Sequence, residues 1–265
     1  MPELPDIEGF KECFEKHALN RRIRKISAPD ERILEDLTVQ GLGRRLKDRE
    51  FKRAFRHGKF LFAKVDDEDE SGWLAFHFGM TGLFAVHGVE QQAPDHTAVD
   101  FEFEDGTALA YVSQRMLGKI TLGDTLEGFI QEYKLGPDAL SENLSVNDCA
   151  ERLANHRGML KSALMNQSII AGIGNEWSDE ILFQCHMHPK VAIKDLGSDD
   201  LSELCRTGRR VLRTGSAANR NGRPLPYQYL GAHRHGDGLC PKCKSKLATV
   251  KVSSRTAYYC PQCQA

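Results

Sequence analysis

The sequence lacks three features that would each place the protein in a different class. No apolar run approaches the roughly 18 residues that a membrane-spanning helix needs, so none is expected. The amino terminus has no basic stretch followed by an apolar one, so it does not resemble a signal peptide, and we expect a cytoplasmic protein. No internal repeat is visible, so the chain must be divided by changes of pattern. Its 265 residues, 40% hydrophobic and 28% charged, suit a globular protein of one large domain or two modest ones.

The net charge of −1 conceals an uneven distribution along the chain. From Lys190 to the end there are 14 Lys and Arg against 5 Asp and Glu, which gives +9, so residues 1–189 carry about −10. A basic segment favours a face that binds a polyanion, although a merely solvated basic surface is an equally common origin. The five acidic residues at positions 66–70 are typical of an exposed loop between two strands.

Residues 1 to about 130 are expected to form one helix followed by an antiparallel β-sandwich or barrel. Ile7, Phe10, Phe14 and Ala18 recur at helical spacing, and Pro5 suits the first turn of that helix. Stretches rich in aromatic and branched residues then predict strands, which are separated by polar residues or glycine. The predicted strands are 22–28, 59–65, 72–79, 82–88, 98–105 and 108–113.

The pattern becomes helical after a break near residue 133. A glycine- and arginine-rich loop begins at residue 215 and leads into a cysteine cluster. We therefore predict an α+β protein with a helix and β-sandwich domain, a helical domain and a small metal-binding hairpin. The predicted helices of the second part are 146–155, 157–166, 175–186 and 198–213. The predicted domains are 1–133, 134–230 and 231–265.

Eight cysteines fall into two sets. Four are scattered through helical surroundings, and we expect buried thiols there. These are Cys13, Cys149, Cys185 and Cys205. The other four follow the spacing C-x2-C-x16-C-x2-C, in which each C-x2-C turn can direct two thiolates at one tetrahedral Zn2+ ion. These are Cys240, Cys243, Cys260 and Cys263. A site closed by four thiolates leaves no position for substrate, so the zinc is expected to be structural and to supply folding free energy.

The opening residues MPELPDIEGF contain a second proline directly behind the initiator methionine. A proline near a terminus is usually only a stiff leader, and an acidic residue at a helix start is favoured by the helix dipole. If Met1 is removed, however, Pro2 carries a secondary amine beside Glu3 and one turn from Asp6. An α-amino group titrates near pH 8, about two units below a lysine, so more of it is neutral and nucleophilic. The stretch is therefore a candidate catalytic centre.

Three basic or polar residues elsewhere are candidate phosphate contacts. Lys59 follows Gly58 in a predicted tight turn, where most lysines are merely solvated. Asn175 lies in GIGN at the predicted start of a helix, where it is a good N-cap and where helix N–H groups bind phosphates. Arg255 lies five residues before Cys260 in the metal-stapled hairpin, which would hold it rigidly toward a phosphate or leave it as an ordinary surface arginine.

Three separated stretches resemble one known family. They are PELPDIE, then GPDAL with LKSALMNQSIIAGIGNEWSDEILF, and finally CPKC with RTAYYCPQCQ. Together with RHGKF and HFGMTG, they resemble in order the formamidopyrimidine-DNA glycosylase and endonuclease VIII family. The resemblance implies a helix–two-turn–helix domain and a zinc finger after the β-sandwich. It also implies a repair enzyme that excises a damaged base from double-stranded DNA and nicks the strand by β/δ-elimination. We expect this enzyme to be a monomer and to associate with the nucleoid.

The resemblance also implies catalytic roles for individual residues. Pro2 is the nucleophile that attacks the sugar C1′ and forms a Schiff base, and Glu3 is the general acid or base. Lys59 contacts the phosphate near the lesion and assists loss of the base. Asp6 departs from the family, which usually has glutamate there, so its carboxylate either holds the sugar or simply caps the helix.

Further residues are implied to hold the DNA. Asn175, Lys161 and Arg255 look like the family's phosphate contacts. Met80, Arg115 and Leu117 match three wedge residues that fill the space left by a flipped base, where the family usually has an aromatic residue at the third position. For Met80, packing in the core is the alternative.

The class of damaged base stays open on the sequence. The loop before the zinc finger is shorter than in members specialised for oxidised purines, and oxidised pyrimidines, hydantoin-type lesions, abasic sites and bulkier adducts are alternatives. A second functional class is a DNA-binding damage sensor or abasic-site lyase with little base excision. A zinc-ribbon RNA-binding protein is a third, and the opening motif argues against it, because binding alone needs no amine at position 2.

Overall fold

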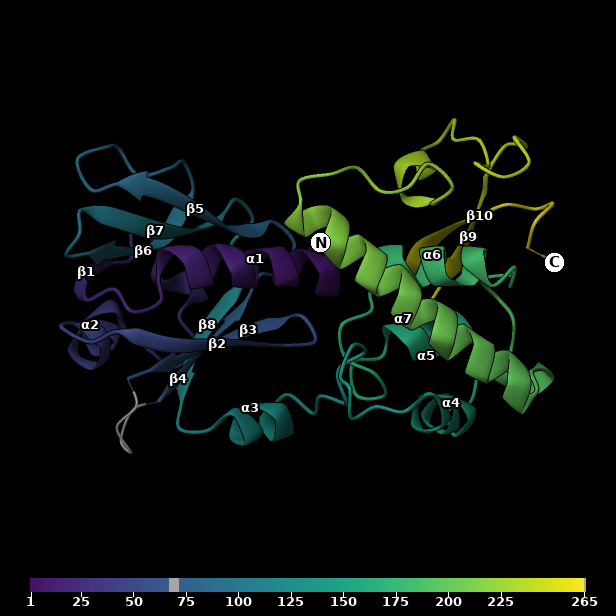
Figure 1. The fold of residues 1–265 in the computed structure, drawn as a ribbon, viewed down its shortest axis with the longest axis horizontal. Helices are drawn as coiled ribbons and strands as arrows, with labels where there is room; N and C mark the ends of the chain where they lie inside the picture. Colours follow the sequence, from purple (N-terminus) through teal and green to yellow (C-terminus); the bar gives the residue numbers. More distant parts are fainter. Residues whose placement is uncertain (67–71, 265) are drawn as a thin grey trace. The chain divides into compact units, whose positions relative to one another are not determined.

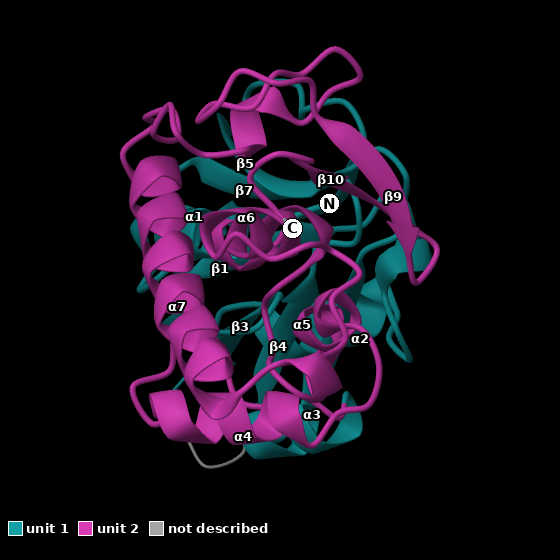
Figure 2. Cartoon of the chain, turned by 90° about the vertical axis from the view of Figure 1, so that its right-hand side faces the viewer, with its two compact units in different colours: residues 1–2, 6–133 teal, residues 3–5, 134–265 magenta. Residues whose placement is uncertain are grey.

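The computed structural model describes residues 1–66 and 72–264, so the predicted acidic loop at 66–70 lies almost entirely outside the described residues. The chain divides into two compact units, which Figure 2 distinguishes by colour. Unit 1 comprises residues 1–2 and 6–133, and unit 2 comprises residues 3–5 and 134–265. In the described part of the chain, no helix is both long and apolar enough to span a membrane.

Unit 1 contains helix α1 (Leu4–His17), apart from its first two residues, and two four-stranded antiparallel sheets (Figure 1). One sheet has the strand order β1-β6-β7-β5 and the other the order β2-β3-β4-β8. Two short helices complete it, α2 (Val39–Leu46) and α3 (Leu126–Glu132). The strands are β1 Ile23–Ser27, β2 Phe51–His57, β3 Phe60–Val65, β4 Trp73–His77, β5 Gly82–Gly88, β6 Thr97–Phe103, β7 Thr107–Ser113 and β8 Lys119–Gly123.

The predicted helix and the six predicted strands are confirmed, whereas strands β2 and β8 were missed. Both missed strands form the edges of one sheet, and three of the seven residues of β2 are charged, as is common in edge strands. The core is built from α1 and both sheets. Within it the ring of Phe14 lies 5.0 Å from that of Phe51 and 5.6 Å from that of Phe84, between ring centroids.

Unit 2 contains four helices and a two-stranded hairpin. The helices are α4 (Val146–Ala154), α5 (Leu160–Met165), α6 (Asn175–Gln184) and α7 (Ser198–Arg220), and the hairpin strands are β9 (Ala248–Val252) and β10 (Arg255–Tyr259). Helix α7 continues to Arg220 instead of ending at residue 213 as predicted. Gly215 lies inside this helix, where the absence of a side chain lets Trp177 of α6 pack against α7. A Cβ at Gly215 would lie only 2.1 Å from Cη2 of Trp177.

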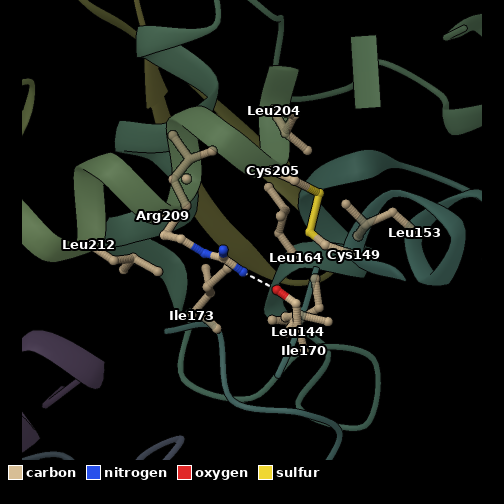
Figure 3. Close-up of a pocket in the computed structure, with 13 residues that line it drawn as sticks. Leu144, Cys149, Leu153, Leu164, Ile170, Ile173, Leu204, Cys205, Arg209 and Leu212 are labelled. Atoms are coloured by element: carbon tan, nitrogen blue, oxygen red, sulfur yellow. Dashed lines mark hydrogen bonds between the residues drawn. A yellow bond between two sulfur atoms is a disulfide. The ribbon is translucent and has the colours of Figure 1, made fainter. Parts of the chain in front are cut away.

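Two of the four cysteines predicted as buried thiols form a disulfide instead. Cys149 of α4 is bonded to Cys205 of α7, across 56 residues of sequence, because the packing of these two helices brings the side chains together (Figure 3). The disulfide borders an aliphatic cavity of about 20 Å³, into which Arg209 also projects. Cys13 and Cys185 remain thiols and are half-buried, and burial raises the pKa of Cys185 to about 11.

Candidate active site and nucleic-acid interface

The carboxylate of Glu3 is buried at the amino-terminal end of α6 in unit 2. Only 2% of Glu3 is exposed. Its oxygens accept hydrogen bonds from the backbone N–H groups of Gly174 at 2.7 Å, Glu176 at 2.9 Å and Trp177 at 3.3 Å. These N–H groups have no partner within the helix, and the positive end of the helix dipole favours a negative charge there. The carboxylate next to Pro2 is therefore fixed in one position.

The turn before α6 has the shape that this docking requires. Gly172 has φ +113°, and its carbonyl accepts a hydrogen bond from the backbone N–H of Leu4 at 3.1 Å. A Cβ at Gly174 would lie 2.3 Å from Cδ of Glu3, and a Cβ at Gly172 would lie 2.5 Å from Cδ1 of Leu4. Gln167 stabilises the turn, because its Oε1 accepts a hydrogen bond from the N–H of Gly172. Glycine at both positions is a steric requirement for the docked residues 3–4.

Asn175 is the first residue of α6, and the predicted N-cap role is wrong because Gly174 occupies the cap position. Its side-chain amide instead donates a hydrogen bond to the carbonyl of Thr256 in β10 at 3.0 Å. Its Oδ1 is buried without a hydrogen-bond partner among the described residues. Asn175 therefore ties the start of α6 to the hairpin strand whose first residue is the exposed Arg255.

The tip of this hairpin is attached to α5. Ser253 and Ser254 both have positive φ, +47° and +63°, and form the two-residue turn between β9 and β10. The hydroxyl of Ser162 in α5 lies 2.7 Å from that of Ser253. The turn directly before Arg255 is thus held by a side chain of the helical part of unit 2.

Lys161 is buried, and its ammonium group has only protein partners in this structure. It donates to the carbonyl of Asn175 at 2.9 Å, to Oγ of Ser178 at 2.6 Å and to Oδ1 of Asp179 at 2.7 Å. An ammonium has three N–H donors, and all three are used. Burial lowers the pKa of Lys161, and the charge of Asp179 opposes that shift. Lys161 therefore stabilises the first turn of α6 through its hydrogen bonds to residues of that helix.

Asp179 connects these elements, and sequence reasoning missed it. Its side chain is fully buried and accepts hydrogen bonds from Lys161, from Arg234 at 2.9 Å and from the backbone N–H of Tyr258 at 3.0 Å. The guanidinium of Arg234 also lies 5.0 Å from the ring centroid of Tyr258. The signal available in the sequence was its position four residues after Asn175, on the same face of the helix.

In unit 1, Lys59 lies in a two-residue turn between β2 and β3 and is only 9% exposed. Arg56, also buried, donates from its guanidinium to the carbonyl of Gly58 at 3.2 Å and forms an ion pair with Glu8 of α1. The turn that carries Lys59 is thereby fastened to α1, the helix that follows Pro2. Arg56 and Glu8 are supporting residues that sequence reasoning missed.

His77 at the end of β4 stays neutral near Lys59. Its burial, and then the positive charges of Lys59 and Lys119, lower the pKa of His77 to about 4. Its Nδ1 accepts a hydrogen bond from the backbone N–H of Gly79 at 3.3 Å. The positive charge of Lys59 is therefore not accompanied by an imidazolium at neutral pH.

The three predicted wedge residues lie on two adjacent loops of unit 1. The backbone N–H of Arg115 donates to Oγ1 of Thr81 at 3.1 Å, next to Met80. The backbone of Gly79 packs directly against that of Leu117, since a Cβ at Gly79 would lie 2.4 Å from the Leu117 carbonyl. Met80 is 38% exposed and Leu117 49% exposed, so neither side chain belongs to the core.

Pro2 is half-buried and precedes α1, and Asp6 lies in the first turn of that helix.

The four patterned cysteines form one cluster. Their Sγ atoms all lie within 4.8 Å of one another, and Cys240 and Cys260 are fully buried. Gln264 joins the cluster to the helical part of unit 2, because it accepts from the N–H of Cys260 at 2.9 Å and donates to the carbonyl of Met187 at 2.8 Å. Four convergent thiolates fit a tetrahedral Zn2+ ion.

Three family models match the chain in succession. They are the formamidopyrimidine-DNA glycosylase N-terminal domain over residues 1–120, the H2TH domain of the same enzymes over 135–223, and the zinc finger found in FPG and IleRS over 239–265. A formamidopyrimidine-DNA glycosylase of Symbiobacterium thermophilum is 31% identical over all of this chain and 89% of its own length. The chain belongs to the formamidopyrimidine-DNA glycosylase family. A relative from Desulfitobacterium hafniense is 29% identical, with both chains fully covered.

Solved structures share the fold of this family member. Lactococcus lactis formamidopyrimidine-DNA glycosylase, bound non-covalently to DNA with an AP site, superposes with a TM-score of 0.88 at 24% identity, covering 99% of both chains. The same enzyme in complex with DNA containing N7-benzyl-Fapy-dG gives a TM-score of 0.85 at 23% identity, again with 99% coverage of both. The predicted α+β fold, with its H2TH domain and zinc finger, is confirmed.

Family membership establishes the general activity. The protein is a DNA-binding glycosylase of base excision repair with AP lyase activity, and its four-cysteine finger holds a structural Zn2+ ion.

Proposed function

We propose that the protein excises damaged, mainly oxidised, bases through the N-terminal amine of Pro2 after removal of Met1. The observation that carries this proposal is the carboxylate of Glu3, fixed by three backbone N–H groups at the start of α6. Because Glu3 is the next residue in the chain, its docking restricts where the amine of Pro2 lies. Nucleophile and acid are thus supplied by neighbouring residues.

The reaction follows from the chemistry of a secondary amine. The nitrogen of Pro2 attacks C1′ of the damaged nucleotide, the glycosidic bond breaks, and the base leaves with a proton. Glu3 is the general acid and base that moves this proton. The sugar ring then opens: the C1′–O4′ bond breaks, O4′ takes up a proton, and C1′ and the proline nitrogen form an iminium. The iminium withdraws electrons, so the neighbouring C2′ proton becomes acidic and the 3′ phosphate is eliminated; a second elimination at the 5′ side completes β/δ-elimination. Lys59 neutralises a phosphate beside the lesion, and Asp6 holds the sugar.

We assign the binding of the flanking DNA to two residues of unit 2. Arg255 contacts a phosphate from the start of β10. Asn175 contacts a second phosphate when its side-chain amide gives up the hydrogen bond to the Thr256 carbonyl and donates to the DNA instead. Lys161 serves as a positioning residue, since its three protons are bound to protein oxygens. Residues 231–265 act as a separate zinc-stabilised module that carries Arg255.

Met80, Arg115 and Leu117 fill the space that a flipped nucleotide leaves in the duplex. Their exposure and common location support this role.

The enzyme acts as a monomer at the nucleoid, away from membranes.

The deciding experiment is borohydride trapping on duplex DNA with an abasic site. The wild-type protein is expected to give a covalent adduct, and a version that retains Met1 should give none, because the nitrogen of Pro2 is then an amide. Pro2→Gly exposes a primary amine instead of the secondary amine of proline and should give less adduct than the wild type. A panel of damaged bases then identifies the substrate. If the wild type binds this DNA without forming an adduct, the Pro2 mechanism is wrong and a damage sensor is the remaining function.

A further inference from the structure

The disulfide between Cys149 and Cys205 takes no part in the chemistry described so far. It joins α4 to α7 across a sequence separation of 56 residues. DNA repair takes place inside cells, where a pool of thiols keeps most cysteines reduced. The disulfides that occur there are usually transient and either catalytic or redox-sensing.

The crosslinked loop contains the parts of unit 2 that hold the Glu3 carboxylate. Helices α5 and α6 both lie between the two cysteines, as does the turn at residues 172–174 on which Glu3 docks. Closing a loop removes conformational freedom from the unfolded chain, and a longer loop removes more. The crosslink thus stabilises the segment on which the position of this carboxylate depends.

Helix α7 also connects the crosslink to Glu3 through packing. Further along α7 from Cys205, Gly215 accommodates the ring of Trp177. The backbone N–H of Trp177 in turn donates to the carboxylate of Glu3 at 3.3 Å. How firmly α7 is held therefore affects the first turn of α6.

Arg209 adds a positive charge to the cavity that the two cysteines line. It follows Cys205 by four residues, so it lies on the same face of α7 (Figure 3). Its guanidinium donates to the backbone carbonyl of Leu144. Among the described residues that line the cavity, none carries a carboxylate. A guanidinium near a thiol favours the thiolate, which is the form that exchanges with a disulfide.

The same cavity provides space for the reduced state. Two bonded sulfur atoms lie closer together than two thiols in contact, so the thiols need room to separate. Cys149 and Cys205 are only 8% and 9% exposed, but both border the cavity of about 20 Å³. The reduced and the oxidised pair can therefore fit between α4 and α7 without a rearrangement of these helices.

The other cysteines compete poorly for oxidation. Burial raises the pKa of Cys13 above its ordinary value and that of Cys185 to about 11, so little thiolate forms at either residue. The remaining four cysteines hold the structural Zn2+ ion. Oxidation is thus directed to the pair on α4 and α7.

We propose that Cys149 and Cys205 form a redox-sensitive crosslink that stabilises the helices of unit 2. Oxidised glutathione, a disulfide of low molecular weight, is the oxidant. One cysteine thiolate attacks a glutathione sulfur and releases one glutathione; the second cysteine thiolate attacks the resulting mixed disulfide and releases the other. The two cysteine thiols lose two protons and two electrons, which the two glutathione thiols receive.

The crosslink gives the enzyme its highest stability under oxidising conditions. The ratio of oxidised to reduced glutathione rises in an oxidised cell, so the bond closes when oxidised bases are being formed. This connection with oxidised bases rests on the proposed function, whereas the crosslink and its effect on stability do not.

The first test compares the oxidised and the reduced wild type, so it needs no substitution. The zinc-bound protein is equilibrated with mixtures of reduced and oxidised glutathione, and its free thiols are identified by alkylation and peptide mass spectrometry. Closure of a loop of 56 residues predicts a melting temperature about 10 °C higher for the oxidised form. Cys149→Ala/Cys205→Ala is the control and should have one melting temperature in all mixtures.

Binding of a duplex with a central abasic-site analogue gives the functional readout. At a temperature between the two melting temperatures, the oxidised wild type should bind at least about tenfold more tightly than the reduced one, because only the folded fraction binds. The double variant should bind equally in both mixtures.

Substitutions of Arg209 test its effect on the rate of closure. Arg209→Met should slow the reaction with oxidised glutathione about threefold, since the loss of thiolate is partly offset by the higher nucleophilicity of a more basic thiol. Arg209→Lys keeps the charge and should restore the rate. A purely structural role would change the melting temperature of both variants and leave the rate of closure unaltered.

Two results would overturn the proposal. In the first, both cysteines remain thiols in an excess of oxidised glutathione; in the second, the bond forms but the oxidised and reduced proteins melt at the same temperature. Neither measurement involves base excision, so both stand even if borohydride trapping fails. A failed trapping experiment affects only the role of Pro2.

Discussion

Oε2 of Glu3 lies 2.7 Å from the backbone nitrogen of Gly174, although 171 residues separate the two in sequence. A side chain next to the N-terminal proline is thereby held by the first turn of a helix in the other half of the chain. The position of this carboxylate depends on the absence of a side chain at Gly174.

Gly174→Ala tests that dependence. The added Cβ would lie 2.3 Å from Cδ of Glu3, so the carboxylate must move. A displacement of about 1 Å can cost about 100-fold in rate, and we expect a loss of that size in base excision. Gly208→Ala in α7 is the matched control, since its Cβ would make an ordinary 3.5 Å contact with Ile181. Single-turnover kinetics on damaged duplex measure the difference; equal rates for both variants would contradict the docking argument.

Lys161→Met removes one partner of a fully buried ion pair. Asp179 would then lose its contact with Lys161 and keep only the contacts with Arg234 and Tyr258. Breaking a buried pair costs about 3–5 kcal/mol, and we expect urea unfolding to show a loss in that range. Lys194→Met, at an exposed position, is the control and should change stability by less than about 0.5 kcal/mol. A small change in both variants would mean that the pair does not stabilise the helical part.

Glu180→Gln tests a pH dependence of stability. Burial raises the pKa of Glu180 to about 7 from an ordinary value of 4.5, although its carboxylate accepts hydrogen bonds from Gln184 and Gly231. The folded protein thus holds a proton more tightly than the unfolded chain. The stabilisation is fully present below pH 4.5 and is lost as the pH rises through about 7.

We therefore expect the wild type to lose about 3 kcal/mol relative to Glu180→Gln between these two pH values. Chemical unfolding of both proteins at several pH values measures this difference. Parallel curves would mean that Glu180 titrates normally in the folded protein.

Removal of zinc should uncouple the hairpin from the helices. The contacts of Thr256 with Asn175 and of Tyr258 with Asp179 both depend on the position of β10. A chelator is expected to reduce DNA binding as strongly as Arg255→Gln does, and to unfold residues 231–265 as seen by limited proteolysis. In the zinc-bound protein, Arg255→Gln should lower the salt slope by about 0.9 without changing the fold. An undiminished slope would exclude a phosphate contact.

Met80→Ala should affect paired and unpaired substrates differently. The side chain is 38% exposed on the loop beside Arg115, so its removal leaves the core intact. Filling the gap matters only when the damaged base must leave a stacked duplex. We expect about a tenfold loss of excision in fully paired DNA and little loss at a lesion in a single-stranded bulge. Equal losses on both would place Met80 outside the wedge.

Sequence patterns were sufficient where the signal is local. The spacing of Cys240, Cys243, Cys260 and Cys263 indicates one metal site, because two cysteines with two residues between them can direct both thiolates at the same ion. The helical period of Ile7, Phe10 and Phe14 similarly predicted α1, whose apolar side is buried. Edge strand β2 escaped the prediction because its charged residues lack the pattern of a buried strand.

Contacts between distant residues could not be read in this way. Nothing local in Cys149 or Cys205 indicates a disulfide, which exists because α4 and α7 pack side by side. Gly215 was interpreted as the end of a helix, whereas it accommodates Trp177. The burial of Lys161 likewise depends on Ser178 and Asp179 reaching its ammonium from the next helix.

The sequence by itself determined the family, the metal site and the chemical types of the candidate active-site groups, since each of these is encoded in short motifs. Only the tertiary structure decided which of those groups are fixed in position and which parts of the chain fix them. The Glu3 carboxylate accepts hydrogen bonds from backbone N–H groups, which no side chain in the sequence reveals. The buried ammonium of Lys161 donates to the backbone carbonyl of Asn175. Backbone hydrogen bonds and burial arise from how elements pack, so no local pattern of side chains records them.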